Sequence, residues 1–178
     1  MLEALLHARG LGAARVLNLA FDSAVVADIV TAMERDLPRL RPARVVIDAV
    51  CNDWLSRSRD YRANLGRALA VARAHGATLT LVKEPMLLAV YGRGDFRFNA
   101  NEGANYAVLT SFASENGVEL VDPAPLLIAH RDEFLFMDDV HLTARGHEVM
   151  AEALAAALAP ALAAGAATQL GKVGAPST

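Results

Sequence analysis

Short apolar runs rich in β-branched residues alternate with segments of helical periodicity along most of this chain. Such alternation is typical of a parallel sheet whose strands are joined by helices, so we predict an α/β fold. Strands are expected at four places: Arg15 to Leu19, Arg44 to Asp48, Thr78 to Val82 and Val118 to Val121.

Helices are predicted between these strands. The apolar positions of the first recur at helical spacing, at Val26, Ile29, Val30, Met33 and Leu37. Pro38 is expected to end this helix, because proline cannot donate the next backbone hydrogen bond. Two more helices are predicted over Asn64 to His75 and over Glu102 to Asn116, each stopped by the glycine that follows it.

One domain is expected over residues 1–160, since 178 residues can bury one core and are too few for two ordinary domains. Thr143 is a favourable N-cap for the last helix, and Pro160 is expected to break it. Residues 161–178 are small and nearly uncharged, which predicts a disordered tail. The long segment from Met86 to Ala100 is predicted to be a mobile loop over a site.

The net charge and the hydropathy of the sequence limit the classes of partner and the locations that we expect. The chain has 17 Lys and Arg against 20 Asp and Glu, a net charge of −3, which gives no indication of nucleic-acid binding. No apolar run reaches the ~20 residues of a membrane span, and the N-terminus lacks the regions of a signal peptide. We expect a cytoplasmic protein if Met1 is the natural start; a secreted or periplasmic location stays open if an N-terminal part is missing.

An aspartate three residues before a histidine stands just ahead of the last predicted helix, as Asp138 and His141. At this spacing the carboxylate can hold one ring nitrogen and leave the other as a general base. The same residues also suit a plain turn, with Asp138 as its cap. A metal site would use Asp138, Asp139, His141 and His147, but no known ligand spacing supports it.

The stretch Asp138-x-x-His141-Leu-Thr-x-x-Gly-His resembles the last sequence block of the SGNH, or GDSL-type, ester hydrolases. Val16-Leu17-Asn18-Leu19 is similar to the second block of that family. Val45-Val46-Ile47, running into Cys51-Asn52-Asp53, is similar to the third, and Asn105 lies where the family runs up to its final strand. The resemblance covers residues 2–158.

This resemblance implies a three-layer α/β/α fold with a parallel, flavodoxin-like sheet in the order 2-1-3-4-5. The first block, a strand ending in Gly-Asp-Ser, has no counterpart in the printed sequence, so the domain is expected to be N-terminally incomplete. That strand would lie between residues 15–19 and 44–48, at the centre of the sheet. An unpaired sheet centre makes self-association possible.

The resemblance also implies a site for carboxylic esters, such as acyl or acetyl groups of lipids or carbohydrates, without a metal or other cofactor. His141 would be the base, Asp138 would orient it, and Asn52 with the backbone N–H of Ser23 would form the oxyanion hole. The family's oxyanion glycines fall at Ser23 and Val50, and the nucleophilic serine is missing. We therefore expect the chain by itself to be inactive or nearly so.

Other interpretations stay open at this point. Ser23, expected to begin a helix after a strand, could be a displaced nucleophile or simply an N-cap. Cys51 could be a nucleophile, although a cysteine at a strand end is usually core packing. The tripeptide Arg93-Gly94-Asp95 matches an adhesion motif by chance. The alternative to an esterase is a pseudoenzyme, a non-catalytic binding or accessory module with the same fold.

Overall fold

The computed structural model describes residues 1–48, 52, 53, 56–86 and 100–173. Its helices and strands, in chain order, are α1 (Leu2–Ala8), α2 (Val26–Leu40), β1 (Arg44–Asp48), α3 (Ser58–Ala74), β2 (Thr78–Val82), α5 (Ala100–Asn116), β3 (Glu119–Val121), α6 (Ala124–Ala129) and α7 (Ala144–Val173). Cys51, Val50 and nearly all of the predicted mobile loop lie outside the described residues. The α/β class is confirmed.

The sheet has three parallel strands in the order β1-β2-β3. β1 pairs with β2 in a register that sets Arg44 opposite Thr78 and Asp48 opposite Val82. Two of the four predicted strands are confirmed residue for residue, and a third begins one position later than expected, at Glu119. All three end at the same edge of the sheet, where ligands of open parallel sheets bind.

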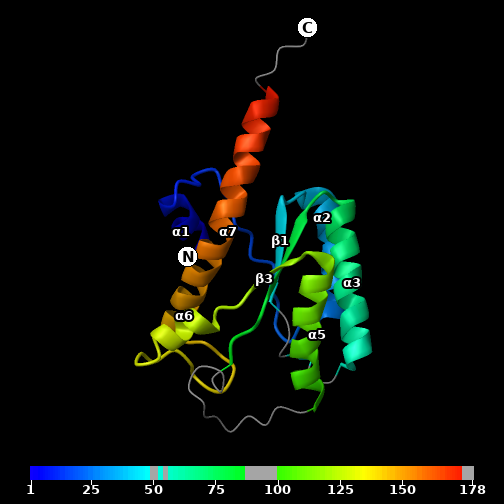
Figure 1. The fold of residues 1–178 in the computed structure, drawn as a ribbon, viewed down its shortest axis with the longest axis vertical. Coiled ribbons are helices and arrows are strands. Elements are labelled where there is room, and N and C mark those ends of the chain that lie inside the picture. Colours follow the sequence, from blue (N-terminus) through cyan, green and yellow to red (C-terminus); the bar gives the residue numbers. More distant parts are fainter. Residues whose placement is uncertain (49–51, 54–55, 87–99, 174–178) are drawn as a thin grey trace.

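The strand predicted at Arg15 to Leu19 is wrong, because the structure gives these residues no strand pairing. The segment leaves α1 and descends between α7 and β1 in the view of Figure 1 on its way to α2. Side chains take two of its backbone donors: Glu3 accepts from Val16 N at 2.7 Å, and Asn18 accepts from Ala20 N at 3.0 Å. The apolar pattern is present, but no strand among the described residues pairs with it.

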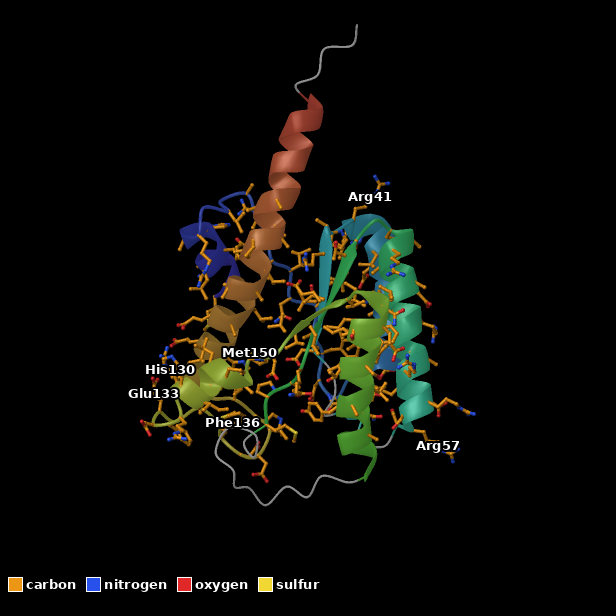
Figure 2. All side chains as sticks on the ribbon, in the orientation of Figure 1. Arg41, Arg57, His130, Glu133, Phe136 and Met150 are labelled. Atoms are coloured by element: carbon orange, nitrogen blue, oxygen red, sulfur yellow. The ribbon has the colours of Figure 1, made fainter. Side chains whose placement is uncertain are left out.

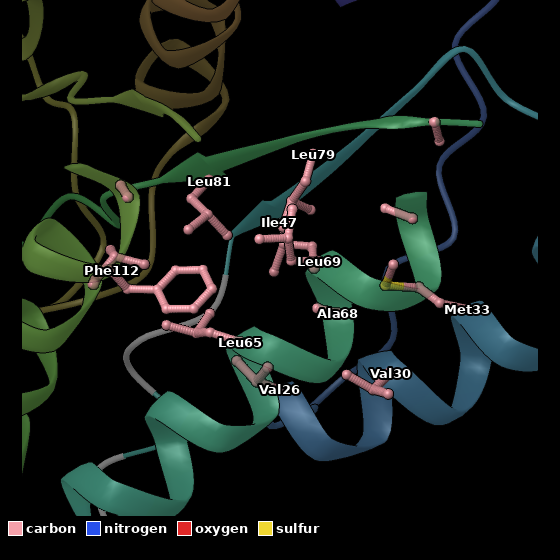
Figure 3. Close-up of a cluster of buried hydrophobic side chains, with 14 of the residues drawn as sticks. Val26, Val30, Met33, Ile47, Leu65, Ala68, Leu69, Leu79, Leu81 and Phe112 are labelled. Carbon is pink, nitrogen blue, oxygen red and sulfur yellow. The ribbon is translucent and has the colours of Figure 1, made fainter. Parts of the chain in front are cut away.

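Helices cover both faces of the sheet (Figure 1). On one face, Ile47, Leu79 and Leu81 pack against α2, α3 and α5, as Figure 3 shows around Leu65 and Phe112. On the other face, Val82 belongs to a smaller cluster with α6, α7 and the loop before α7; its other members are Leu127, Leu135, Phe136, Leu142, Val149 and Met150. These two clusters give the three layers that the sequence predicted.

Two helices continue beyond a proline that lies within them. α2 continues past Pro38 to Leu40 and closes with Arg41 N donating to Leu37 O at 2.9 Å. α7 continues through Pro160 to Val173, so the predicted break is wrong. Proline removes one hydrogen bond, and the alanine-rich flanks of Pro160 favour helix strongly enough to continue it. The domain limit at residue 160 stays a prediction.

One described stretch, Ala144–Ala164 of α7, is long and apolar enough to cross a membrane by length and composition alone. Its mean hydropathy is 1.2, and part of it is buried against the rest of the fold. Core helices of soluble proteins meet the same criterion, so the finding is weak evidence for a span.

Candidate active site

Backbone hydrogen bonds within the loop that precedes α7 hold the conformation of that loop. Met137 N donates to His141 O at 2.8 Å, and Thr143 N donates to Leu135 O at 2.8 Å. Phe136 and Leu142 form an antiparallel bridge between these contacts, and both side chains are buried. The loop is thereby a tight hairpin-like turn that presents residues 138–141 outward.

The loop is also fixed to α7. Thr143 Oγ1 accepts from Gly146 N at 3.1 Å, which confirms Thr143 as the cap of this helix. Gly146 approaches the loop so closely that a Cβ there would lie 2.2 Å from Leu135 O. Only glycine fits that contact, which gives a packing reason for its place in the motif.

A second tether holds the outer side of the loop. Arg145, and after it His130, donate to the carboxylate of Glu133 and lower its pKa to about 2. Figure 2 shows His130 and Glu133 together on the outside of the loop, with Phe136 and Met150 inside, at the opposite end of the molecule from Arg41.

Asp138 and His141 make the contact that the sequence predicted. The carboxylate lies 2.8 Å from His141 Nδ1 and accepts the backbone N–H groups of His141 and Val140 at 2.7 and 2.9 Å. These backbone bonds, with the imidazole contact after them, lower the pKa of Asp138 to about 2. Its hydrogen bond and charge raise the pKa of His141. With Nδ1 donating to the carboxylate, Nε2 is the ring atom available as a base.

His141 borders a hollow of about 210 Å³. The hollow lies where β1 and β2 end, and its lining residues are Asp48, Glu84, Pro85, Met137, Val140, His141, Leu142 and His147. Surrounding protein and the charge of Glu84 raise the pKa of Asp48, although part of its surface is open to solvent. None of these described lining residues carries a hydroxyl or a thiol, so this described part of the hollow presents a base without a hydroxyl or thiol nucleophile.

The two predicted oxyanion donors lie close to each other. Asn52 Nδ2 donates to Ala24 O at 3.1 Å, which sets the amide beside the turn that contains Ser23. The charge of Asp22, the residue before Ser23, contributes to the raised pKa of His141. The turn is therefore within electrostatic range of the imidazole, although neither Asn52 nor Ser23 lines the hollow.

Ser23 does not begin α2 as expected. The helix starts at Val26 with Val25 as its N-cap residue, and Ser23 lies before it with φ of 58°. This left-handed conformation favours glycine.

Asp53, and not Ser23, accepts a backbone hydrogen bond at the start of α2. Its buried carboxylate accepts Val26 N at 2.9 Å and Ser56 Oγ at 2.7 Å. Burial raises its pKa, and these two hydrogen bonds partly oppose that effect.

The GDSL-like Lipase/Acylhydrolase family model matches residues 1–149 of the chain. The chain belongs to this family. No curated protein matches it.

Solved structures with the same fold include esterases. The acetyl xylan esterase AlAXEase superposes with a TM-score of 0.73 at 14% identity, over 86% of each chain. A lipolytic protein of the G-D-S-L family from Desulfitobacterium hafniense gives 0.70 at 17% identity, over 88% of this chain and 87% of that one. An acetylxylan esterase from Geobacillus stearothermophilus gives 0.70 at 20% identity, over 86% and 76%. At these identities the likeness shows the fold.

Within this GDSL-like family member, sequence reasoning missed Asp48 and Glu84. A usable signal was their position, because Asp48 ends one predicted strand and Glu84 follows another, at the edge where the base lies. No group of three or more His, Cys, Asp or Glu side chains within the described ranges is arranged to hold a metal. Asp139 and His147 therefore do not join Asp138 and His141 in a metal-binding cluster in this part of the chain.

Proposed function

We propose that this chain carries the acid-base half of a serine-type carboxylic ester hydrolase site. The observation that supports it is the 2.8 Å contact between Asp138 and His141 Nδ1, which leaves Nε2 as the available ring atom of a side chain that borders the hollow at the strand ends. His141 is the general base, Asp138 orients it, and the pKa of the imidazole is raised by their contact.

The reaction needs a serine hydroxyl beside Nε2. As its oxygen bonds to the ester carbonyl carbon, its proton passes to Nε2. The proton then goes to the departing alcohol as the carbon–oxygen bond breaks, and water releases the acyl group from the serine by the same steps. Asn52 stabilises the oxyanion: one amide hydrogen bonds to Ala24 O, and the other remains as a donor.

A hydroxyl or thiol nucleophile is the part that the described lining of the hollow does not include. We expect very slow ester turnover from the 178-residue protein, since loss of the serine of such a triad can cost about 10⁶ in turnover. We do not assign this role to Ser23, because a nucleophile must contact the base directly and Ser23 lies outside the described lining of the hollow that His141 borders.

For the substrate we propose esters of small acyl groups, such as acetyl, on carbohydrates or lipids. Two structural neighbours are named as acetyl xylan esterases. The hollow of about 210 Å³ next to His141 suits a small group, with Pro85, Met137, Val140 and Leu142 as its apolar side.

The test is a fusion that adds a designed strand ending in Gly-Asp-Ser to the N-terminus through a short flexible linker. We expect p-nitrophenyl acetate turnover and labelling of the added serine by a fluorophosphonate probe. Both should be lost in His141→Gln and much reduced in Asp138→Asn, while the unfused chain stays unlabelled. Labelling of Ser23 in the unfused chain, or turnover that survives His141→Gln, would contradict the proposed roles.

A second candidate is a non-catalytic binding or accessory module. The observation that favours it is the backbone of Ser23, whose φ of 58° is a conformation that favours glycine. The resemblance puts an oxyanion glycine of the family at this position. A fusion that folds and positions its serine yet gives neither turnover nor labelling would support the module over the enzyme.

A further inference from the structure

Asn105 of α5 is a buried polar residue that the proposed reaction does not use. Its side chain is 0% exposed. Its Nδ2 donates to two backbone carbonyls of the loop between β1 and α3, Asp53 O at 2.9 Å and Ser56 O at 3.2 Å. Because both neighbours are carbonyl oxygens, they determine which end of the amide faces the loop. Asn105 therefore joins α5 to this loop.

The other end of this amide finds no donor among the described residues. Asn105 Oδ1 is buried there without a hydrogen-bond partner. A buried acceptor that is left unsatisfied lowers stability, so it calls for an explanation. The contacts of this side chain are concentrated on the loop, which indicates that holding the loop is what the asparagine does.

The loop that Asn105 holds carries Asn52. The side chain of Asn52 is exposed, whereas the next residue, Asp53, is 1% exposed. The carboxylate of Asp53 accepts from Val26 N at 2.9 Å, and its backbone carbonyl accepts from Asn105. Asp53 is thus fixed through its side chain by α2 and through its backbone by α5. The exposed amide of Asn52 stands directly beside this fixed residue.

The direction of the Asn52 amide depends on its backbone. Its Nδ2 gives one hydrogen to Ala24 O at 3.1 Å, and the second N–H is the proposed oxyanion donor. Such a donor accelerates the reaction only if it is oriented before charge develops. A misplacement of about 1 Å in a positioned group can cost on the order of 10²-fold in rate. Small movements of the loop would therefore matter more for catalysis than for the fold.

We propose that Asn105 is a positioning residue of the oxyanion hole: by holding the carbonyls of Asp53 and Ser56, it fixes the loop from which Asn52 donates. Asn105 does not reach the reacting atoms, so it is not a catalytic residue. Its effect on rate rests on the proposed function; its hold on the loop does not.

Asn116 offers a matched control on the same helix. Its Nδ2 donates to Phe112 O at 2.9 Å, four residues earlier in α5. This bond also joins an asparagine amide to a backbone carbonyl, but it stays within α5. Asn116→Ala therefore removes a bond of the same chemistry and leaves the contacts of the loop in place.

The first test uses the whole 178-residue protein and needs no catalysis. Nuclear magnetic resonance should show the side-chain amide of Asn52 as two separate, sharp proton signals. Asn105→Ala should broaden them and speed the amide exchange of Val26 by about tenfold or more, since a lost buried hydrogen bond frees the loop. Asn105→Leu, which keeps a buried side chain of similar size but donates nothing, should do the same. Asn116→Ala should change neither signal nor exchange.

The second test uses the fused protein and p-nitrophenyl acetate. Asn105→Ala should lower kcat by about 10- to 100-fold with little change in KM, and Asn52→Ala by about 10²- to 10³-fold. The double variant should be no slower than Asn52→Ala alone, because Asn105 acts through Asn52. Asn116→Ala should keep its kcat, even where its melting temperature falls as much as that of Asn105→Ala.

The outcomes separate this role from the proposed function. Release of Asn52 in both Asn105 variants, with non-additive losses of kcat, supports the positioning role. An Asn52 amide that stays ordered in both variants overturns it, and so do losses of kcat that add in the double variant. A loop released by Asn105→Ala in a protein whose fusion has no turnover counts against the esterase and supports the hold of Asn105 on the loop.

Discussion

The loop 134–143 and the segment 15–23 both match sequence blocks of the family, and they differ in what each needs in order to form. The loop forms its own backbone hydrogen bonds: Met137 N donates to His141 O, and Thr143 N donates to Leu135 O. The segment has the apolar residues of a strand, but Leu17 and Leu19 remain exposed. A short turn can be specified locally, whereas a strand depends on a partner elsewhere in the chain.

The largest expected effect contrasts a paired strand with the unpaired one. Leu79→Ala in β2 removes a side chain that is 3% exposed, and should lower the free energy of unfolding by about 2 to 5 kcal/mol. Leu19→Ala should change it by no more than about 0.5 kcal/mol. Urea denaturation of both variants measures the difference. A large loss for Leu19→Ala would show that the segment is packed in solution.

Next in size is the contact between the loop and α7. Gly146→Ala places a Cβ against Leu135 O and should cost about 1 to 3 kcal/mol of unfolding free energy. The matched control is Gly66→Ala in α3, where a Cβ meets nothing within 4 Å and a gain of about 0.5 to 1 kcal/mol is expected. Thermal unfolding followed by circular dichroism measures both. Equal melting temperatures would mean that the loop yields easily.

The contact that holds the start of α2, just after the segment, can be removed at Asp53. Asp53→Ala leaves Val26 N and Ser56 Oγ without their acceptor and should cost about 1 kcal/mol, as loss of a helix N-terminal cap does. Asp28→Ala removes the exposed carboxylate that accepts from Val25 N at 3.3 Å and should cost less. Chemical denaturation ranks the two, and the reverse order would place the main cap of α2 at Asp28.

The smallest effect on stability, and the most informative about the base, is expected from Asp138→Asn. It should lower the pKa of His141, whose raised value depends first on the bond to Asp138. A titration of the imidazole by nuclear magnetic resonance measures this. Asp139→Asn removes a neighbouring charge and leaves the Asp138 contact in place, so its effect should be much smaller. An unchanged titration in Asp138→Asn would refute the orienting role.

The two groups of this pair also have opposite pH windows. The lowered pKa of Asp138 stabilises the loop above the ordinary pKa of a carboxyl group, and that contribution is lost as the pH falls toward 2. The raised pKa of His141 stabilises it fully below the ordinary pKa of histidine, and that contribution is lost as the pH rises through the folded value. The pair is therefore best formed in mildly acidic solution.

The sequence predicted β1 and β2 fully because both are short apolar runs between helices, with Ile47, Leu79 and Leu81 in the core. It predicted the 15–19 strand wrongly because periodicity records which side chains suit a sheet and not whether a neighbour exists. It predicted the contact between Asp138 and His141 and the cap at Thr143, since both depend on residues a few positions apart.

What the sequence could not supply were contacts made across the fold. Asn105 is one example: its Nδ2 donates to Asp53 O at 2.9 Å and to Ser56 O at 3.2 Å, 52 and 49 residues away. Asp48 is another, because its pKa is raised first by burial and then by the charge of Glu84, which lies two residues beyond β2. The local pattern of residues does not predict contacts between side chains that lie so far apart in the sequence.

The open edge of β1 has a further consequence during synthesis. Parallel sheets pair late in folding because their strands are far apart in sequence, and exposed edges and apolar segments favour aggregation in the meantime. Within the described residues no strand covers the outer edge of β1 after the sheet has formed. The yield of this chain in a cell should therefore depend on chaperones.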